Sequence, residues 1–164
     1  MKQKIAAALL ILASTTSGWL ASAQAEELPV VVNFTLETKE SADKQAPILL
    51  LYKSKNCIYC ERVLREYLLP MQRNPEYGNK VILRQIDIAS KDKIIDFDGK
   101  ITTQSRLAKS HGVTAVPTVI FFDDKGKELS RITGLLGADF YQAYLDNAIN
   151  DSQAKIKPII DPAR

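Results

Sequence analysis

The two cysteines of this chain lie three positions apart, in the segment Cys57-Ile58-Tyr59-Cys60. The apolar run Ile48-Leu49-Leu50-Leu51-Tyr52 precedes them and predicts a central strand that is covered on both faces. Beyond them, apolar residues recur at helical spacing and predict a helix with one buried stripe: Val63, Leu64, Tyr67, Leu68 and Met71. The CxxC motif therefore stands where a buried strand passes into a helix, which favours a single α/β unit.

This position of the cysteines predicts a redox-active dithiol. A helix N-terminus presents unpaired backbone N–H groups and the positive end of the helix dipole, so it stabilises the thiolate of Cys57. Cys60 lies one turn further along and can attack a mixed disulfide formed at Cys57, which releases the partner. Lys53 and Lys55 precede the motif. Their charges either add to the stabilisation of the thiolate or belong to an exposed loop.

A structural disulfide and a metal site are the two alternatives for the cysteine pair. Oxidising compartments favour disulfides, but a CxxC closes so short a loop that it adds little stability in the chain-entropy model. Zinc normally takes four ligands, whereas this chain has no second CxxC and one histidine, His111. Two thiolates would suit a soft ion such as copper(I). We favour the redox interpretation and expect neither a metal ion nor another cofactor.

The N-terminus predicts a secretory signal peptide over residues 1–25. Lys2 and Lys4 precede an apolar run from residue 5 to residue 13, and small residues follow as far as Ala23-Gln24-Ala25. The apolar run is shorter than the roughly 20 residues that a transmembrane helix needs, so a membrane span is the weaker interpretation. We expect cleavage after Ala25 and a mature protein that is not embedded in a membrane.

Removal of this segment changes the charge balance of the chain. Without Lys2 and Lys4, 20 of the 22 basic residues remain against 19 acidic ones, a net charge of +1. Such a balance gives no indication of nucleic acid or of an anionic membrane as a partner. The remaining length suits one folded domain, which we place at residues 26–150. Residues 151–164 are expected to form a flexible C-terminal tail.

The rest of the chain alternates between strand and helix patterns. Apolar runs bounded by turn residues predict four further strands, at 28–32, 81–88, 116–122 and 128–132. Helical spacing and end signals predict further helices, at 35–45, 103–111 and 140–149. We expect Pro70 to kink or end the helix that carries the cysteines. Residues 89–102 contain Asp98-Gly99 and are expected to form a loop or a small hairpin.

In this order of elements the chain resembles the thioredoxin superfamily, over residues 44–150. A second signature is Ala115-Val116-Pro117-Thr118, which looks like the loop whose cis-proline lies against the CxxC in that fold. The resemblance implies an α/β thioredoxin fold, in which helices flank a central mixed β-sheet. It also implies an insertion before the third helix.

Tyr59 inside the CxxC, the long insertion and the signal make the chain similar to bacterial periplasmic thioredoxins of the Sox type. The resemblance implies a periplasmic enzyme that exchanges a dithiol with protein disulfides, with Cys57 as the attacking thiolate and Cys60 as the resolving thiol. It further implies that the backbone of Val116 pairs with the substrate strand and that Pro117 shapes the floor below that strand. Tyr59 either packs against the partner or covers the sulfur atoms.

The direction of electron flow stays open at this stage. We favour a monomeric reductant that a membrane thiol carrier recharges, because the periplasm is kept oxidising. A thiol oxidant and an isomerase of the same fold are alternatives. An isomerase is less favoured because residues 26–46 leave no room for a separate dimerisation domain.

Few groups near the cysteines are suited to proton transfer. Leu51 stands six residues before the first cysteine, where cytosolic thioredoxins bury an acid, so that acceptor for the proton of Cys60 is missing. Glu61 is the nearest acid in sequence, and we expect it to be a solvated helix residue. His111 is expected at the end of its helix, where the dipole favours its charged form, and not in catalysis.

Overall fold

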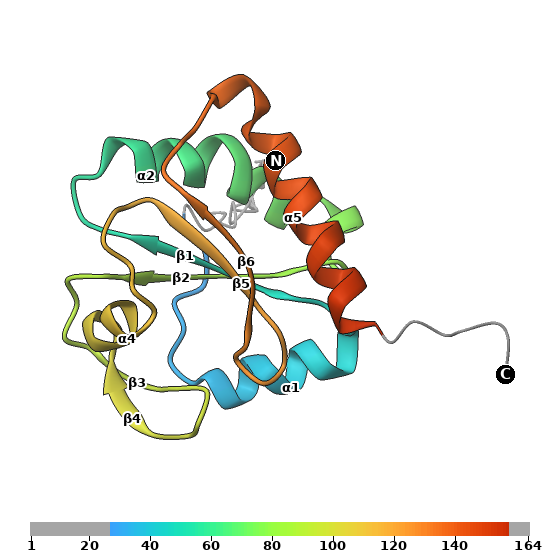
Figure 1. Cartoon of the computed structure of the whole chain (residues 1–164). Coiled ribbons are helices and arrows are strands. Elements are labelled where there is room, and N and C mark those ends of the chain that lie inside the picture. The colour runs from blue at the N-terminus through green and yellow to red at the C-terminus, as the bar shows by residue number, and fades with distance from the viewer. Residues whose placement is uncertain (1–26, 158–164) are drawn as a thin grey trace, which may run out of the picture.

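A computed structural model describes residues 27–157 of the chain. The predicted signal segment, 1–25, and residues 158–164 of the predicted tail lie outside this range. The described part contains a four-stranded sheet in the order β2-β1-β5-β6 (Figure 1). Its strands are β1 (Ile48–Lys53), β2 (Ile82–Asp87), β5 (Thr118–Phe122) and β6 (Glu128–Thr133).

The sheet is mixed, as the family resemblance implies. Strand β1 pairs with β2 in parallel and with β5 antiparallel, and β6 pairs antiparallel with β5. Residues Ile48 to Tyr52 of β1 are completely buried. The continuous apolar run before the cysteines is therefore the centre of the sheet, covered on both faces.

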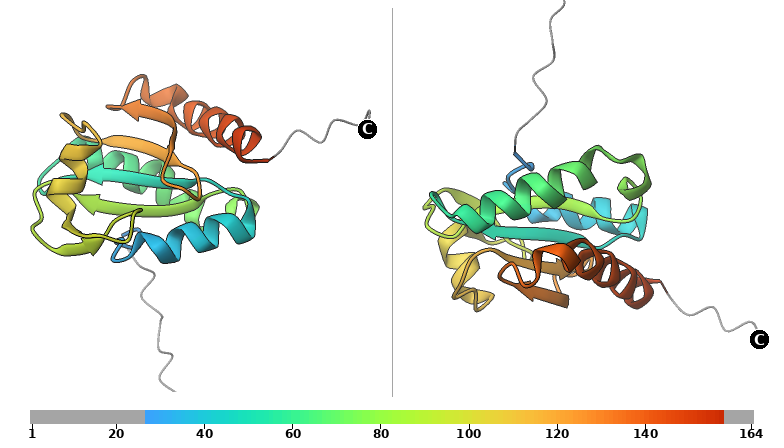
Figure 2. Two further views of the ribbon diagram at one scale, coloured as in Figure 1. Left: turned by 60° about the horizontal axis from the view of Figure 1, so that its bottom comes forward. Right: turned by 90° about the horizontal axis from the view of Figure 1, so that it is seen from above.

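Helices cover both faces of the sheet (Figure 2). One continuous helical stretch consists of α2 (Ile58–Arg62), the π-helical η1 (Val63–Leu68) and α3 (Leu69–Arg73). It packs with α5 (Tyr141–Ile156) on the face to which Leu49 and Leu51 point. Helices α1 (Phe34–Lys44) and α4 (Gln104–Ser110) cover the opposite face, to which Leu50 and Tyr52 point.

The N-terminal segment differs from its prediction. Residues Leu28 to Val32 form no regular strand, and their β-pairing is limited to isolated bridges at Val30 and at the adjoining Asn33. Pro29 accepts a hydrogen bond from Gln85 through its carbonyl group but has no N–H to donate. A continuous ladder cannot form across this position, so the predicted strand is wrong.

Pro70 does not end the helix that carries the cysteines. The helix continues to Arg73, and Pro70 lies in the first turn of α3. In the wider π-helical turn just before it, the N–H of Leu69 bonds to the carbonyl of Leu64, five residues earlier. A wider turn leaves room for the proline ring, which would otherwise meet the preceding helical carbonyl.

The predicted insertion is a small hairpin. Strands β3 (Lys93–Ile95) and β4 (Ile101–Thr103) form a separate antiparallel pair. Between them, Phe97 folds back onto the core, with its ring centroid 4.2 Å from that of Phe34 and 5.0 Å from that of Phe122. The hairpin is therefore anchored to the face of the sheet that α1 and α4 cover.

The two helices after the insertion begin near their predicted positions, but the last one ends later than expected. Thr103 caps α4, and Gly112 follows its last turn with a φ of 65°. Helix α5 continues to Ile156, so the first residues of the predicted flexible tail are helical. Ser152 is fully buried there, which shows that packing against the domain continues beyond Asp151.

Two glycines test the packing of Phe97. Gly126 and Gly99 have nearly the same φ, 76° and 77°, but a Cβ atom at Gly126 would lie 2.5 Å from Cγ of Phe97 and one at Gly99 would meet nothing within 4 Å. We expect Gly99→Ala to cost about 1 kcal/mol, from backbone strain alone. Gly126→Ala should cost about 3 kcal/mol, because strain and overpacking add.

Urea unfolding measures both costs as shifts of the transition midpoint. Equal midpoints for the two alanine variants would show that Phe97 does not press on the turn that contains Gly126.

Candidate active site

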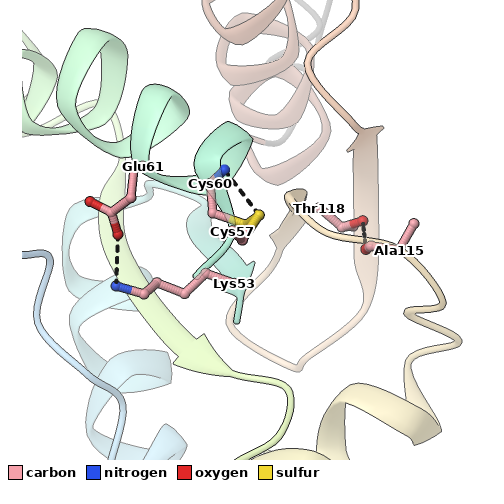
Figure 3. Close-up of a disulfide and its surroundings, with 6 residues drawn as sticks. All are labelled: Lys53, Cys57, Cys60, Glu61, Ala115 and Thr118. Carbon is pink, nitrogen blue, oxygen red and sulfur yellow. Dashed lines mark hydrogen bonds and ion pairs between the residues drawn. A yellow bond between two sulfur atoms is a disulfide. The ribbon is translucent and has the colours of Figure 1, made fainter. Parts of the chain in front are cut away.

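The two cysteines form a disulfide at the start of α2 (Figure 3). Cys57 is the N-cap of this helix, and its Sγ atom accepts a hydrogen bond from the backbone N–H of Cys60 at 3.1 Å. Cys57 is partly exposed, whereas Cys60 is 1% exposed. A partner can therefore reach the sulfur of Cys57 more easily than that of Cys60.

A short loop places the cysteines at the helix start. Residues 54–56 follow β1, and Asn56 has a φ of 61°, in the left-handed region that asparagine tolerates better than most residues. The N–H of Glu61 then bonds to the carbonyl of Cys57 at 3.1 Å, which begins the helix. The N-terminus of α2 thus coincides with the first cysteine, as the sequence pattern predicts.

The two residues between the cysteines face solvent. The side chain of Ile58 is 76% exposed and that of Tyr59 is 61% exposed. Together they form an apolar surface directly beside the disulfide. Such a surface suits contact with another protein.

The segment Ala115–Thr118 lies beside the disulfide, on the side away from Lys53 (Figure 3). Its Val116–Pro117 peptide bond is cis, and Pro117 is buried. The hydroxyl of Thr118 donates to the carbonyl of Ala115 at 2.8 Å, and the N–H of Gly134 donates to the carbonyl of Pro117 at 2.7 Å. Within residues 27–157, the backbone N–H and C=O of Val116 have no hydrogen-bond partner.

Lys53 lies on the other side of the disulfide and is not an exposed loop residue. Its side chain is 13% exposed, and its Nζ atom lies 2.8 Å from Oε2 of Glu27 and 3.9 Å from Oε1 of Glu61 (Figure 3). The Glu61 side chain is 44% exposed, so it is a solvated helix residue as expected, and it also pairs with Arg65 at 3.3 Å. Lys55 is exposed, as a loop lysine should be.

Glu27 is the site residue that sequence reasoning missed. Burial acts to raise the pKa of its carboxyl group, but hydrogen bonds from Lys53 and Gln85 outweigh that effect and hold the pKa below its usual range. The charged chain Glu27–Lys53–Glu61 therefore borders the CxxC at the end of β1, where Leu51 is completely buried. No local pattern links Glu27 to cysteines 30 residues later, so the sequence offered no signal for it.

His111 lies away from the disulfide and in its neutral form. It is the C-cap of α4, where the dipole was expected to favour the charged ring. Burial instead lowers the pKa of His111. The hydroxyl of Tyr52, whose own pKa burial raises, forms a hydrogen bond with Nδ1 of His111. Tyr52 points to the face of the sheet opposite α2, so this pair belongs to the core.

Two further observations concern residues 27–157 only. No group of three or more His, Cys, Asp and Glu side chains there is arranged to hold a metal ion. None of the helices in that part of the chain is long and apolar enough to cross a membrane.

Comparison with known proteins agrees with the fold and with the motif. The family described as thioredoxin-like domain matches residues 34–149, which include both cysteines and Pro117. The chain therefore belongs to the thioredoxin-like domain family. Its CxxC is the motif of the thiol:disulfide oxidoreductases within that family.

The curated relatives are thiol:disulfide interchange proteins named DsbD. The chain is 27% identical over 106 residues to the protein of Pectobacterium atrosepticum, a match that covers 63% of this chain and 17% of that protein. It is 26% identical over 113 residues to the protein of Actinobacillus pleuropneumoniae, covering 68% and 18%. The chain thus spans less than a fifth of the length of these relatives.

Solved structures of thioredoxins share the fold. Mitochondrial thioredoxin 3 of Saccharomyces cerevisiae superimposes with a TM-score of 0.51 at 18% identity, over 76% of this chain and 94% of that one. The thioredoxin of Malassezia sympodialis gives a TM-score of 0.52 at 17% identity, over 77% and 94%. At these identities the likeness establishes the thioredoxin fold alone.

The ion pair of Lys53 makes a prediction about stability in acid. A carboxyl group whose pKa is lowered by folding stabilises the protein above its unfolded pKa, and that contribution is lost as the pH falls through the folded pKa. Glu27 is such a group, with an ordinary pKa of 4.5. Lys53→Met removes its cation, so the variant should lose less stability than the parent between about pH 5 and pH 2.

Urea unfolding at several pH values measures this difference. Lys100→Met is the matched control, because Lys100 pairs with Asp98 in a fully solvated position and its loss should leave the acid slope unchanged. Parallel slopes for the parent and Lys53→Met would mean that Lys53 does not stabilise ionised Glu27.

Proposed function

We propose that the chain is a periplasmic thiol:disulfide oxidoreductase that exchanges its Cys57/Cys60 dithiol with disulfides of partner proteins, acting as the reductant. The observation that carries this proposal is the asymmetry of the two sulfurs. An accessible cysteine at a helix N-terminus is joined to one that is 1% exposed. One sulfur is open to a partner, and the other is held where only the first can meet it.

The first step uses the reduced protein with Cys57 as thiolate. The N-terminal N–H groups of α2, one of which already bonds to its Sγ atom, stabilise the negative charge. The thiolate attacks one sulfur of the partner disulfide. A bond forms between that sulfur and Cys57, the partner's S–S bond breaks, and its other sulfur leaves as a thiolate that takes up a proton from water.

The second step uses Cys60. Its thiol loses a proton, and the thiolate attacks Sγ of Cys57 in the mixed disulfide. The Cys57–Cys60 bond forms and the partner leaves with its second thiolate, which is protonated in turn. The partner disulfide has gained two electrons and two protons, and the protein has become the disulfide that the structure contains.

The partner chain would lie over the segment Ala115–Thr118. The free backbone groups of Val116 offer one N–H and one C=O to an extended strand, in the manner of β-augmentation. Pro117 is buried and would lie below that strand. The hydrogen bonds from Thr118 to Ala115 and from Gly134 to Pro117 hold the segment in place. Tyr59, 61% exposed, would pack against the partner.

The protein would be exported to the periplasm and returned to its dithiol form there by a membrane partner. Residues 1–25 carry the features of a cleaved secretory signal, and the relatives are called thiol:disulfide interchange proteins. In an oxidising compartment the disulfide form accumulates, so a reductant needs a membrane thiol carrier to return it to the dithiol. The protein would act as a monomer.

The reduction potential of the cysteine pair tests the direction of electron flow. Mature protein is equilibrated in graded dithiothreitol or glutathione buffers, and free thiols are counted with an alkylating mass tag. A reductant should give a reduction potential of about −270 mV. A value near about −120 mV would instead identify a thiol oxidant, and the absence of a reversible disulfide would overturn the redox function.

Single cysteine variants test the two roles. With a disulfide-containing protein as substrate, Cys60→Ser should accumulate a mixed disulfide, because Cys57 attacks but nothing resolves the product. Cys57→Ser should neither exchange nor trap, because Cys60 is buried. Non-reducing gels with mass spectrometry report both outcomes, and equal trapping by the two variants would refute the assignment of roles.

A further inference from the structure

A pocket of about 600 Å³ is lined by Lys53, Ser54 and Lys55 of the loop that leads to Cys57, and no residue of the segment 115–118 lines it. Its walls come from the loop residues 53–55, the segment 85–92 at the end of β2, the start of α4 and the N-terminal segment. The proposed exchange with the partner backbone does not use this pocket. Lys55 lines it and stands two residues before Cys57.

Two carboxylates that line the pocket, those of Asp87 and Asp92, have oxygen atoms that accept no hydrogen bond from residues 27–157. Glu27 and Lys53 pair with each other. Asp87 uses one carboxylate oxygen to accept from the N–H of Ala89, and the carboxylate of Asp92 has no hydrogen-bond or ion-pair partner within residues 27–157. With Lys55, the lining carries three carboxylates against two ammonium groups, which favours a cation.

Gln85 adds an independent observation. This side chain lines the pocket and is 3% exposed, yet its Oε1 atom has no hydrogen-bond partner. Its Nε2 group donates to the carboxylate of Glu27. The amide cannot be turned round, because two acceptor oxygens would then face each other. A buried amide oxygen without a donor costs free energy, which a donor that enters the pocket and displaces the groups covering this atom would remove.

We propose that this pocket binds the guanidinium or ammonium group of a basic side chain on the partner polypeptide. A guanidinium presents five donors and no acceptor, and it bonds to carboxylates in pairs, as Asp87 and Asp92 allow. Val30 and Ala89, which are exposed, supply apolar surface for the side-chain stem.

The proposal rests on the proposed function, because the partner must be joined to Cys57. Two residues of extended chain span about 7 Å. A basic residue within a few positions of the partner's cysteine would therefore reach the pocket during exchange. The pocket would select among disulfides by charge, which contacts with the partner backbone at Val116 cannot do.

Matched peptides test this selection. Each carries one cysteine in a mixed disulfide with thionitrobenzoate, and they differ only in having arginine or glutamine three residues from that cysteine. Pre-reduced mature protein attacks the disulfide in a single turnover and releases coloured thionitrobenzoate, so no further electron donor is needed. We expect the arginine peptide to react about tenfold faster at low concentration, since hydrogen bonds to charged groups are among the stronger ones.

The ratio of the two rates is then measured in variants. Asp92→Asn and Gln85→Leu should bring the ratio towards one. Asp98→Asn is the matched control, because it removes an aspartate from the same insertion but outside the pocket, and it should leave the ratio unchanged. A ratio near one in the parent protein would overturn the pocket while leaving the oxidoreductase intact.

A binding experiment distinguishes a pocket that does not bind basic side chains from a protein that lacks the redox function. The arginine peptide with serine in place of cysteine is titrated into the oxidised protein, and amide chemical shifts of residues 53–55 and 85–92 are followed. Shifts that Asp92→Asn abolishes would support the pocket even if no exchange occurred, whereas no shifts would overturn it. Equally tight binding of free arginine amide would overturn the partner polypeptide as the source of the cation.

Discussion

The complete burial of strand β1 is the constraint on which the site depends. Leu49 and Leu51 pack under α2 and α5, and Ile48, Leu50 and Tyr52 pack under α1 and α4. Each such side chain contributes about 1.5–3 kcal/mol when it leaves water. The strand is therefore held from both sides until Lys53, and the loop that follows it must emerge at one edge of the sheet, where the cysteines begin α2.

The same strand brings the second part of the site to the first. Tyr52 of β1 lies opposite Thr118 of β5 in the antiparallel ladder, and Thr118 fixes the segment that contains Pro117 through its bond to Ala115. Two stretches about 60 residues apart in sequence thus meet beside the disulfide. A partner chain would find a reactive sulfur and free backbone groups within one surface.

Charge organises the other side of the disulfide. Lys53 is the next residue after Leu51 on the same face of β1, and its ammonium group is balanced by Glu27 from the N-terminal segment and by Glu61 from α2. These contacts join three elements around the end of the strand. They also leave Gln85, Asp87 and Asp92 as the acceptors of the neighbouring pocket, so the two sides of the CxxC differ in chemistry.

The sequence by itself determined the features that depend on neighbouring residues. Local periodicity predicted the buried strand β1 and the helix start at Cys57, and the family resemblance implied the mixed sheet. The turn residues Asp98-Gly99 left a loop and a hairpin open, and the structure contains the hairpin. Of the two outcomes expected at Pro70, an end of the helix does not occur, because a π-helical turn precedes the proline and the helix continues to Arg73.

Only the tertiary structure decided which distant groups share an environment. It paired Glu27 with Lys53, buried His111 so that its pKa is lowered, and left the Oε1 atom of Gln85 without a donor. Electrostatic and desolvation effects depend on distance in space and on exclusion of water, not on spacing along the chain. For this reason the cysteines and the Val116-Pro117 segment were predicted from the sequence, whereas the pairing of Lys53 with Glu27 and the burial of Gln85 were not.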